Sequence, residues 1–107
     1  MIPGESEKQF QKEVVRFART LRIPVFFTQR SLGSPAGWPD LVLLTPPELR
    51  LRELKTDAGK LTPIQAETIE QLKRCTSLST DVWRPADWHR IVEELLAWQK
   101  SIRPESR

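Results

Sequence analysis

Residues 37–55 read GWPDLVLLTPPELRLRELK, and this stretch decides the fold of the chain. The apolar run 41–44 and the alternating run 49–55 predict two short strands, and the proline-rich turn between them predicts that they pair like a hairpin. Asp40 opens the first strand, and Glu53 lies near the end of the second. Pairing is therefore expected to bring one carboxylate from each strand together.

The chemistry of these two carboxylates suits a metal ion. Carboxylate oxygens are ligands that Mg²⁺ prefers, and the ammonium of Lys55 beside them suits a phosphodiester. Side chains alternate along a strand, so Glu53 and Lys55 share a face with the apolar Leu49 and Leu51. A charge on a core face is costly unless it is paired or binds a metal. Glu53 and Lys55 could pair with each other at the sheet edge, but Asp40 leads a strand too apolar to be solvated, which favours a nuclease site.

These residues resemble the PD-(D/E)xK nuclease superfamily and, more narrowly, the small VRR-NUC family of stand-alone nucleases. The matching segments keep the order of that family over nearly the whole chain. They are residues 6–11, 37–43, 52–55, 59–65 and 82–88. Residues 30–34 depart from the arginine-rich loop expected before the Gly-x-Pro-Asp motif. A lone match to the two motifs is common by chance, whereas the series of five is specific.

The resemblance implies a fold and a site. The fold is a restriction-endonuclease-like α/β sandwich with a central mixed sheet flanked by helices, which agrees with the element order helix, strand, strand, strand, helix, strand, helix read from the sequence. Asp40, Glu53 and the backbone carbonyl of Leu54 would bind Mg²⁺ or Mn²⁺, with Glu7 as a further ligand through water or a second ion. Lys55 would orient the attacking water or stabilise the transition state.

Composition predicts one soluble globular domain spanning residues 1–107, with an ordered core at about 6–98 and a polar tail at 101–107. Hydrophobic residues make up 38% and charged residues 29%. No apolar stretch approaches the ~20 residues of a membrane span, and residues 1–5 do not resemble a signal peptide. The single cysteine, Cys75, forms neither an internal disulfide nor a zinc site and is expected in the core. A cytoplasmic protein without a small-molecule cofactor is the simplest expectation.

Basic residues suggest where nucleic acid would bind. The first helix, capped by Ser6, carries an apolar face and, opposite to it, the cations Lys8, Lys12, Arg16 and Arg19. Such a row is either a solvated helix face or a phosphate-facing stripe that ignores base sequence. The full set of predicted DNA contacts is Lys8, Lys12, Arg16, Arg30, Ser31, Lys60 and Arg84.

Gln65 has two interpretations. Thr62 and Pro63 are favoured at the start of a helix, and Gln65, as its third residue, would complete a capping box. Gln65 is also expected to face inward, in the same sector as Ile64 and Cys75, where it could orient the attacking water beside the carboxylates. VRR-NUC enzymes carry a glutamine at this place, so the resemblance favours a catalytic role.

The function predicted from these features is a structure-specific DNA endonuclease that resolves four-way (Holliday) junctions. A broader nickase or flap nuclease is the alternative within the class, and a DNA-binding module without chemistry is the alternative outside it. A four-way junction is nearly two-fold symmetric and one domain offers one metal site, so we expect a homodimer. The last helix offers a candidate interface, with a core role as the alternative, in Trp88, Leu95, Leu96 and Trp98.

Overall fold

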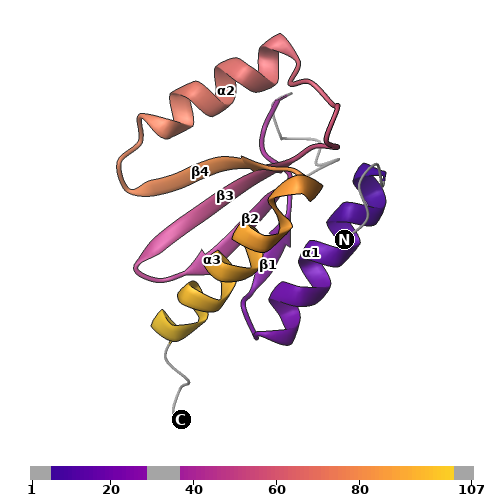
Figure 1. Ribbon diagram of the computed structural model, residues 1–107. Helices are drawn as coiled ribbons and strands as arrows, with labels where there is room; N and C mark the ends of the chain where they lie inside the picture. The colour runs from indigo at the N-terminus through magenta and orange to yellow at the C-terminus, as the bar shows by residue number, and fades with distance from the viewer. Residues whose placement is uncertain (1–5, 29–36, 103–107) are drawn as a thin grey trace.

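The computed structural model describes residues 6–28 and 37–102, which form three α-helices and four strands in the predicted order (Figure 1). A short 3₁₀ turn precedes the last helix. The elements are α1 (Glu7–Thr20), β1 (Val25–Phe27), β2 (Leu41–Thr45), β3 (Glu48–Leu54), α2 (Pro63–Lys73), β4 (Leu78–Trp83), η1 (Pro85–Asp87) and α3 (Trp88–Ser101). None of the described helices has the length and apolar character needed to span a bilayer.

The sheet is mixed, as predicted. Its strand order is β1-β2-β3-β4. The pairs β1–β2 and β2–β3 are antiparallel, whereas β4 runs parallel to β3. Because parallel neighbours need a crossover connection, the chain passes through α2 between β3 and β4. The predicted α/β sandwich is therefore confirmed, and only boundaries differ: β4 begins at Leu78, three residues before the predicted strand.

Helices cover the two faces of the sheet unequally. α1 and α3 pack side by side on one face, and α2 lies along β4 on the other side (Figure 1). The main core lies under α1 and α3 and includes the apolar stripe of α1. Its fully buried members are Phe10, Val14, Ala18, Ile23, Leu41, Leu43, Leu54, Trp83, Ile91 and Leu95. Leu51, Ile69 and Leu72 are also buried but do not belong to this cluster. Ile69 and Leu72 lie on α2, which packs against β4.

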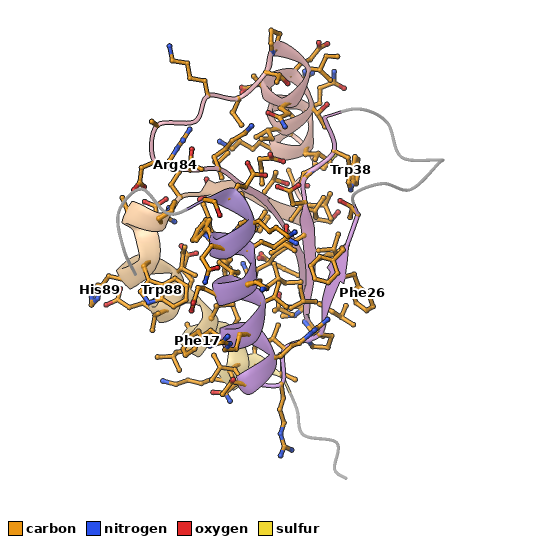
Figure 2. All side chains as sticks on the ribbon, turned by 90° about the vertical axis from the view of Figure 1, so that its right-hand side faces the viewer. Phe17, Phe26, Trp38, Arg84, Trp88 and His89 are labelled. Atoms are coloured by element: carbon orange, nitrogen blue, oxygen red, sulfur yellow. The ribbon has the colours of Figure 1, made fainter. Side chains whose placement is uncertain are left out.

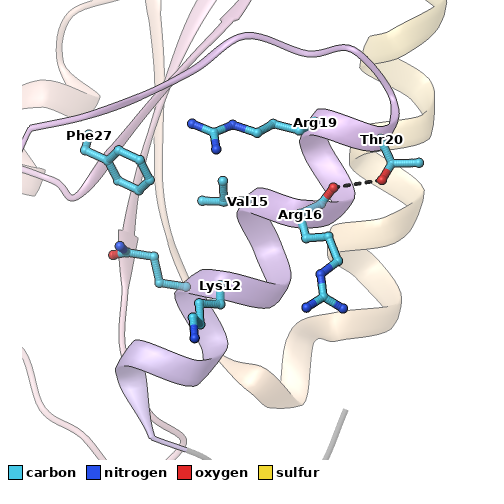
Figure 3. Close-up of a pocket in the computed structure, with 7 residues that line it drawn as sticks. Lys12, Val15, Arg16, Arg19, Thr20 and Phe27 are labelled. Carbon is cyan, nitrogen blue, oxygen red and sulfur yellow. Dashed lines mark hydrogen bonds between the residues drawn. The ribbon is translucent and has the colours of Figure 1, made fainter.

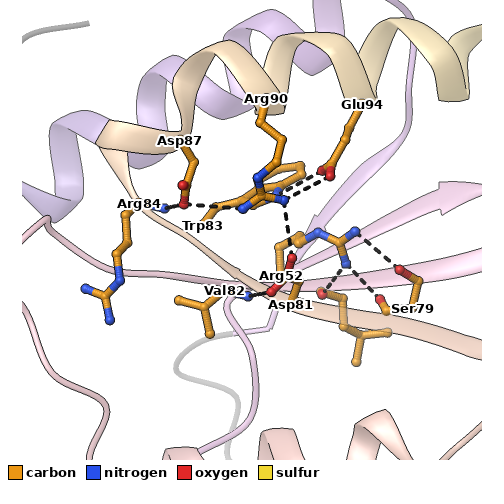
Figure 4. A network of polar contacts seen from close by, with 10 residues as sticks. Arg52, Ser79, Asp81, Val82, Trp83, Arg84, Asp87, Arg90 and Glu94 are labelled. Carbon is orange, nitrogen blue, oxygen red and sulfur yellow. Dashed lines mark hydrogen bonds and ion pairs between the residues drawn. The ribbon is translucent and has the colours of Figure 1, made fainter.

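Two arginines of β3 lie on the face that carries the main core, which the sequence did not predict. Arg52 is only 3% exposed. Its guanidinium carbon lies 5.0 Å from the ring centroids of Trp83 and Trp98, which stack on each other at 5.9 Å. Nη1 donates to the carbonyl oxygens of Leu51 and Ser79, each at 2.8 Å (Figure 4). Burial lowers the pKa of Arg52 to about 10, so it stays charged at neutral pH.

Arg52→Ala is expected to lower the free energy of unfolding by about 3 kcal/mol, because the change removes charged hydrogen bonds and leaves a cavity beside the stacked tryptophans. Arg90→Ala is the matched control. Arg90 pairs with Asp81, Asp87 and Glu94, but its side chain is 44% exposed (Figure 4), so its loss should cost less than about 1 kcal/mol. Urea unfolding followed by tryptophan fluorescence measures both, and equal costs would contradict a special role for Arg52.

The last helix does not have the surplus apolar surface expected of an interface. Leu95 and Trp98 are buried, and Trp88 packs against Phe17 at 5.9 Å between ring centroids (Figure 2). Of the four residues proposed for the interface, only Leu96 is exposed. The core alternative is therefore correct, because α3 must cover three strands and its apolar stripe is used to do so.

Two further burial predictions are wrong. Cys75 is exposed because α2 ends at Lys73, so the cysteine lies beyond the helix rather than on its inner face. Ile64, in the first turn of α2, is 54% exposed. Large exposed apolar side chains occur instead on β1, at Phe26 and Phe27.

Candidate active site

The structure places Asp40 and Glu53 side by side. Leu41 of β2 pairs with Arg52 of β3, so Asp40, one residue before Leu41, lies opposite Glu53, one residue after Arg52. The backbone N–H of Leu54 donates to Asp40 Oδ2 at 3.0 Å, which fixes the aspartate against β3. The two carboxyl groups are close enough for each to change the pKa of the other.

Glu53 is a buried carboxyl group with only one of its two oxygens hydrogen-bonded to a described residue. Its side chain is 1% exposed, and its Oε2 accepts a hydrogen bond from Gln65 Nε2 at 3.3 Å. Its other oxygen, Oε1, is buried without a hydrogen-bond partner among the described residues. A buried carboxylate with an unsatisfied oxygen is costly, and such atoms in native proteins point to a missing ligand, ion or water.

Burial and mutual repulsion change the protonation of this pair. Burial, then the charge of Asp40, raises the pKa of Glu53 to about 8, although Lys55 acts against the shift. Burial also raises the pKa of Asp40, against the opposing effects of the Leu54 N–H, of the neighbouring Glu53 and of the charge of Lys55. With a pKa of about 8, Glu53 is the carboxyl group of the pair that holds a proton at neutral pH. A cation bound between two such carboxyl groups would favour the ionised form of both.

Gln65 forms the predicted capping box and also contacts Glu53, while its role in orienting the attacking water stays a prediction. Thr62 caps α2, and its hydroxyl accepts from the N–H of Gln65 at 3.1 Å, while Gln65 Oε1 accepts from the N–H of Thr62 at 2.9 Å. The amide nitrogen of the same side chain is thereby free to donate to Glu53. Gln65 thus uses its amide oxygen in the capping box and its amide nitrogen on the carboxylate of Glu53. The cap therefore holds the amide in place.

Gln65→Glu is expected to lower DNA cleavage tenfold or more, about 1.4 kcal/mol of transition-state stabilisation, because it replaces the donor to Glu53 with a third carboxylate. Oε1 and its cap remain, so the melting temperature should change little at acidic pH. Thr62→Ala is the control: it removes the cap at a cost of about 1 kcal/mol and keeps the amide. Retained cleavage by Gln65→Glu would return Gln65 to a purely structural role.

Lys55 and Glu7 lie near the pair without touching it directly. Lys55 follows β3, where its N–H donates to the carbonyl of Trp83 at 3.1 Å, and its charge acts on Asp40, Glu53 and Glu7. Glu7 is exposed in the first turn of α1, and partial desolvation followed by the charge of Asp40 raises its pKa. Within residues 6–28 and 37–102, no three His, Cys, Asp or Glu side chains form a group that could hold a metal ion. Glu7 is thus not in place as a third direct ligand, and a contact through water or a second ion remains a prediction.

Gly37 has a structural role that the sequence motif did not reveal. Its φ is +89°, a conformation that side chains disfavour. A Cβ built on it would lie 2.6 Å from Ile64 Cγ2 and 2.9 Å from Ile64 O. The chain can therefore pass close to the first turn of α2 only at a glycine. This close approach keeps Asp40, three residues later, near Gln65 of the same turn.

The remaining predicted DNA contacts have different surroundings. Lys8, Lys12 and Arg16 are exposed on α1, and Lys60 is exposed in the loop after β3. Nη1 of the half-buried Arg84 instead donates to the carbonyl oxygens of Thr56 at 2.7 Å and Gly59 at 2.6 Å, so this side chain fastens the loop. Arg30 and Ser31 lie outside the described residues.

Comparison with known proteins supports the fold. No family model and no curated protein matches the chain. A solved structure described as a VRR_NUC domain protein matches with a TM-score of 0.70 and 21% sequence identity, over 92% of each chain. At this identity the likeness establishes a shared fold, which is the fold that the sequence resemblance implied.

Proposed function

We propose that this chain, which has the fold of a VRR_NUC domain protein, is a cytoplasmic metal-dependent endonuclease that hydrolyses phosphodiester bonds in branched DNA, above all in four-way junctions. The observation that supports the chemistry is the carboxyl pair of Asp40 and Glu53, with one oxygen of Glu53 buried and unpartnered. A merely structural glutamate at 1% exposure would need a partner for each oxygen.

The residues present fit Mg²⁺ or Mn²⁺. Asp40, Glu53 and the backbone carbonyl of Leu54 would hold the ion, and all of them offer the hard oxygen ligands that these cations prefer. When bound, such an ion lowers the pKa of a coordinated water and offsets charge on the scissile phosphate. The orphaned Oε1 of Glu53 supports this assignment, because a cation would satisfy that oxygen.

The protein's own groups would orient the reaction. The N–H of Leu54 holds Asp40, and the amide of Gln65 holds Glu53, so neither carboxylate rotates freely. Lys55 would place its ammonium beside the attacked phosphate, where it orients the incoming water or stabilises charge in the transition state. A binding module without chemistry would need no such arrangement.

A homodimer remains our proposal because a symmetric junction must be cut on two opposing strands. Since α3 does not provide the surface, the better candidate is the sheet face on the opposite side from α1 and α3, where Phe26 and Leu44 are 54% and 41% exposed. Figure 2 shows Phe26 and Trp38 on the same side of the molecule, away from Phe17 and Trp88. Light scattering at micromolar concentration should give twice the mass of the chain, and a monomer would contradict the proposal.

The test of function compares three DNA substrates of equal sequence: a four-way junction, a flap and a plain duplex. Each is incubated with the purified protein in Mg²⁺, in Mn²⁺ or in EDTA. We expect paired cuts in the junction, with much slower cutting of the duplex and none in EDTA. Equal rates on all three substrates would favour a general nickase, and a faster rate on the flap would favour a flap nuclease.

A further inference from the structure

We propose that the groove between α1 and β1 binds a single-stranded DNA segment, with a nucleobase against Phe27 and phosphates at Lys12 and Arg19. The inference rests on the proposed function and deepens it, because it names the part of a branched substrate that the protein would recognise away from the carboxylates.

The groove is large enough for a nucleotide. It forms a cavity of about 590 Å³ that lies between one side of α1 and the end of β1, within the size range of small-molecule sites. Figure 3 shows Phe27 of β1 facing Val15, Arg19 and Lys12 of α1 across this space. Val15 is buried and Phe27 is 46% exposed, so the groove has an apolar floor and an accessible aromatic ring.

The charge of the groove is entirely positive. Lys12, Arg16 and Arg19 line it, and none of the described residues that line it is acidic. The ion pairs of the described chain involve Arg50, His89 and Arg90 instead, so the three cations of α1 have no carboxylate partner there. Unpaired cations on one helix face are the pattern that nucleic-acid backbones bind.

The aromatic ring distinguishes this groove from a simple basic patch. The guanidinium of Arg19 lies 5.8 Å from the centroid of the Phe27 ring. Aromatic rings and guanidinium planes are the surfaces on which unstacked bases lie, and this stacking tolerates any base. A base inside a duplex has both faces covered by its neighbours. The combination therefore fits a single strand rather than a duplex.

The position of the groove agrees with a strand that leaves the carboxylates. Glu7 begins α1, and partial burial followed by the charge of Asp40 raises its pKa, so the start of α1 lies near the carboxylates. At 1.5 Å per residue, Lys12 lies roughly 8 Å and Arg19 roughly 18 Å farther along the helix axis. Unpaired nucleotides next to the cutting site could thus continue along α1 and enter the groove.

The experiment measures binding of fluorescein-labelled oligo(dT) of twelve nucleotides by anisotropy in EDTA, where no cleavage occurs. Phe27→Ala is expected to weaken binding roughly tenfold. Leu96→Ala is the matched control, because Leu96 is also a large exposed apolar side chain but lies on α3 and does not line the groove, so its loss should leave binding unchanged. Replacing both Lys12 and Arg19 with Ala should reduce the slope of log K against the logarithm of salt concentration by about 0.7 per lost phosphate contact. Lys100→Ala, in the last turn of α3, should leave this slope unchanged.

The outcomes separate this inference from the proposed function. Equal binding by wild type and Phe27→Ala, or equal losses for Leu96→Ala and Phe27→Ala, would overturn the proposed binding of a base in the groove. Competition by inorganic polyphosphate as strong as by oligo(dT) would also overturn it, because no base would then be recognised. If binding depends on Phe27 but no DNA is cut in the presence of metal, the proposed binding groove would be supported and the proposed nuclease function would be contradicted.

Discussion

Asp40→Asn and Glu53→Gln are each expected to abolish DNA cleavage while the protein stays folded and still binds DNA. Each change removes a charge that the metal needs, and the lost stabilisation of several kcal/mol corresponds to more than about a hundredfold in rate. Cleavage of a labelled four-way junction in Mg²⁺ measures the loss, and anisotropy with the uncut junction measures binding.

Glu67→Gln is the matched control for the charge change. Glu67 is exposed on α2, where it accepts a hydrogen bond only from Gln71 among the described contacts. This variant changes the net charge by the same amount as Glu53→Gln and should cut the junction like wild type. Wild-type cleavage by Asp40→Asn or Glu53→Gln would remove these carboxylates from the active site.

Glu53→Gln is also expected to raise stability at alkaline pH in the absence of metal. The pKa of Glu53 is raised to about 8 from an ordinary value of 4.5, mainly by burial. Between these two values the folded state holds a proton that the unfolded state has lost, so the free energy of unfolding falls as pH rises from about 4.5 through about 8. Glutamine does not titrate and escapes this loss.

The difference in unfolding free energy between Glu53→Gln and wild type should therefore grow by several kcal/mol across that window, at about 1.4 kcal/mol per pKa unit. Urea unfolding in EDTA at pH 5.5, 7 and 8.5 measures it. Adding Mg²⁺ at pH 8.5 should stabilise wild type and not the variant, because a ligand stabilises only the state that binds it. A constant difference at all pH values would show that Glu53 is ionised in the fold.

Sequence patterns predicted the parts of the structure that depend on local alternation and turn chemistry. The run 41–44, the proline turn and the run 49–55 determine the β2–β3 pairing, and that pairing alone puts Asp40 opposite Glu53. Thr62 with Gln65 likewise predicted the start of α2. These features are set by neighbours along the chain, so they could be read before the fold was known.

Features that depend on which face is covered by which helix were not predictable in this way. Alternation places Arg52 on the opposite face of β3 from Glu53, but it could not show that tryptophans from β4 and α3 would pack against Arg52. The same limit explains why the sequence could not decide whether Trp98 lies in the core or in an interface, since its position on the helix suits both. The catalytic roles of Asp40, Glu53, Lys55 and Gln65 remain predictions, which the variants above test.

The contact of Arg84 with the carbonyl oxygens of Thr56 and Gly59 has an evolutionary consequence. Surface loops normally tolerate insertions and deletions. Here the loop after Lys55 is fastened to the end of β4 by Arg84, and Asp57 accepts from the N–H of Ala86 at 2.8 Å. A change in the number of residues between Lys55 and Lys60 would break these attachments. Among diverging relatives of this protein, this exposed segment should therefore keep its length even where its sequence varies.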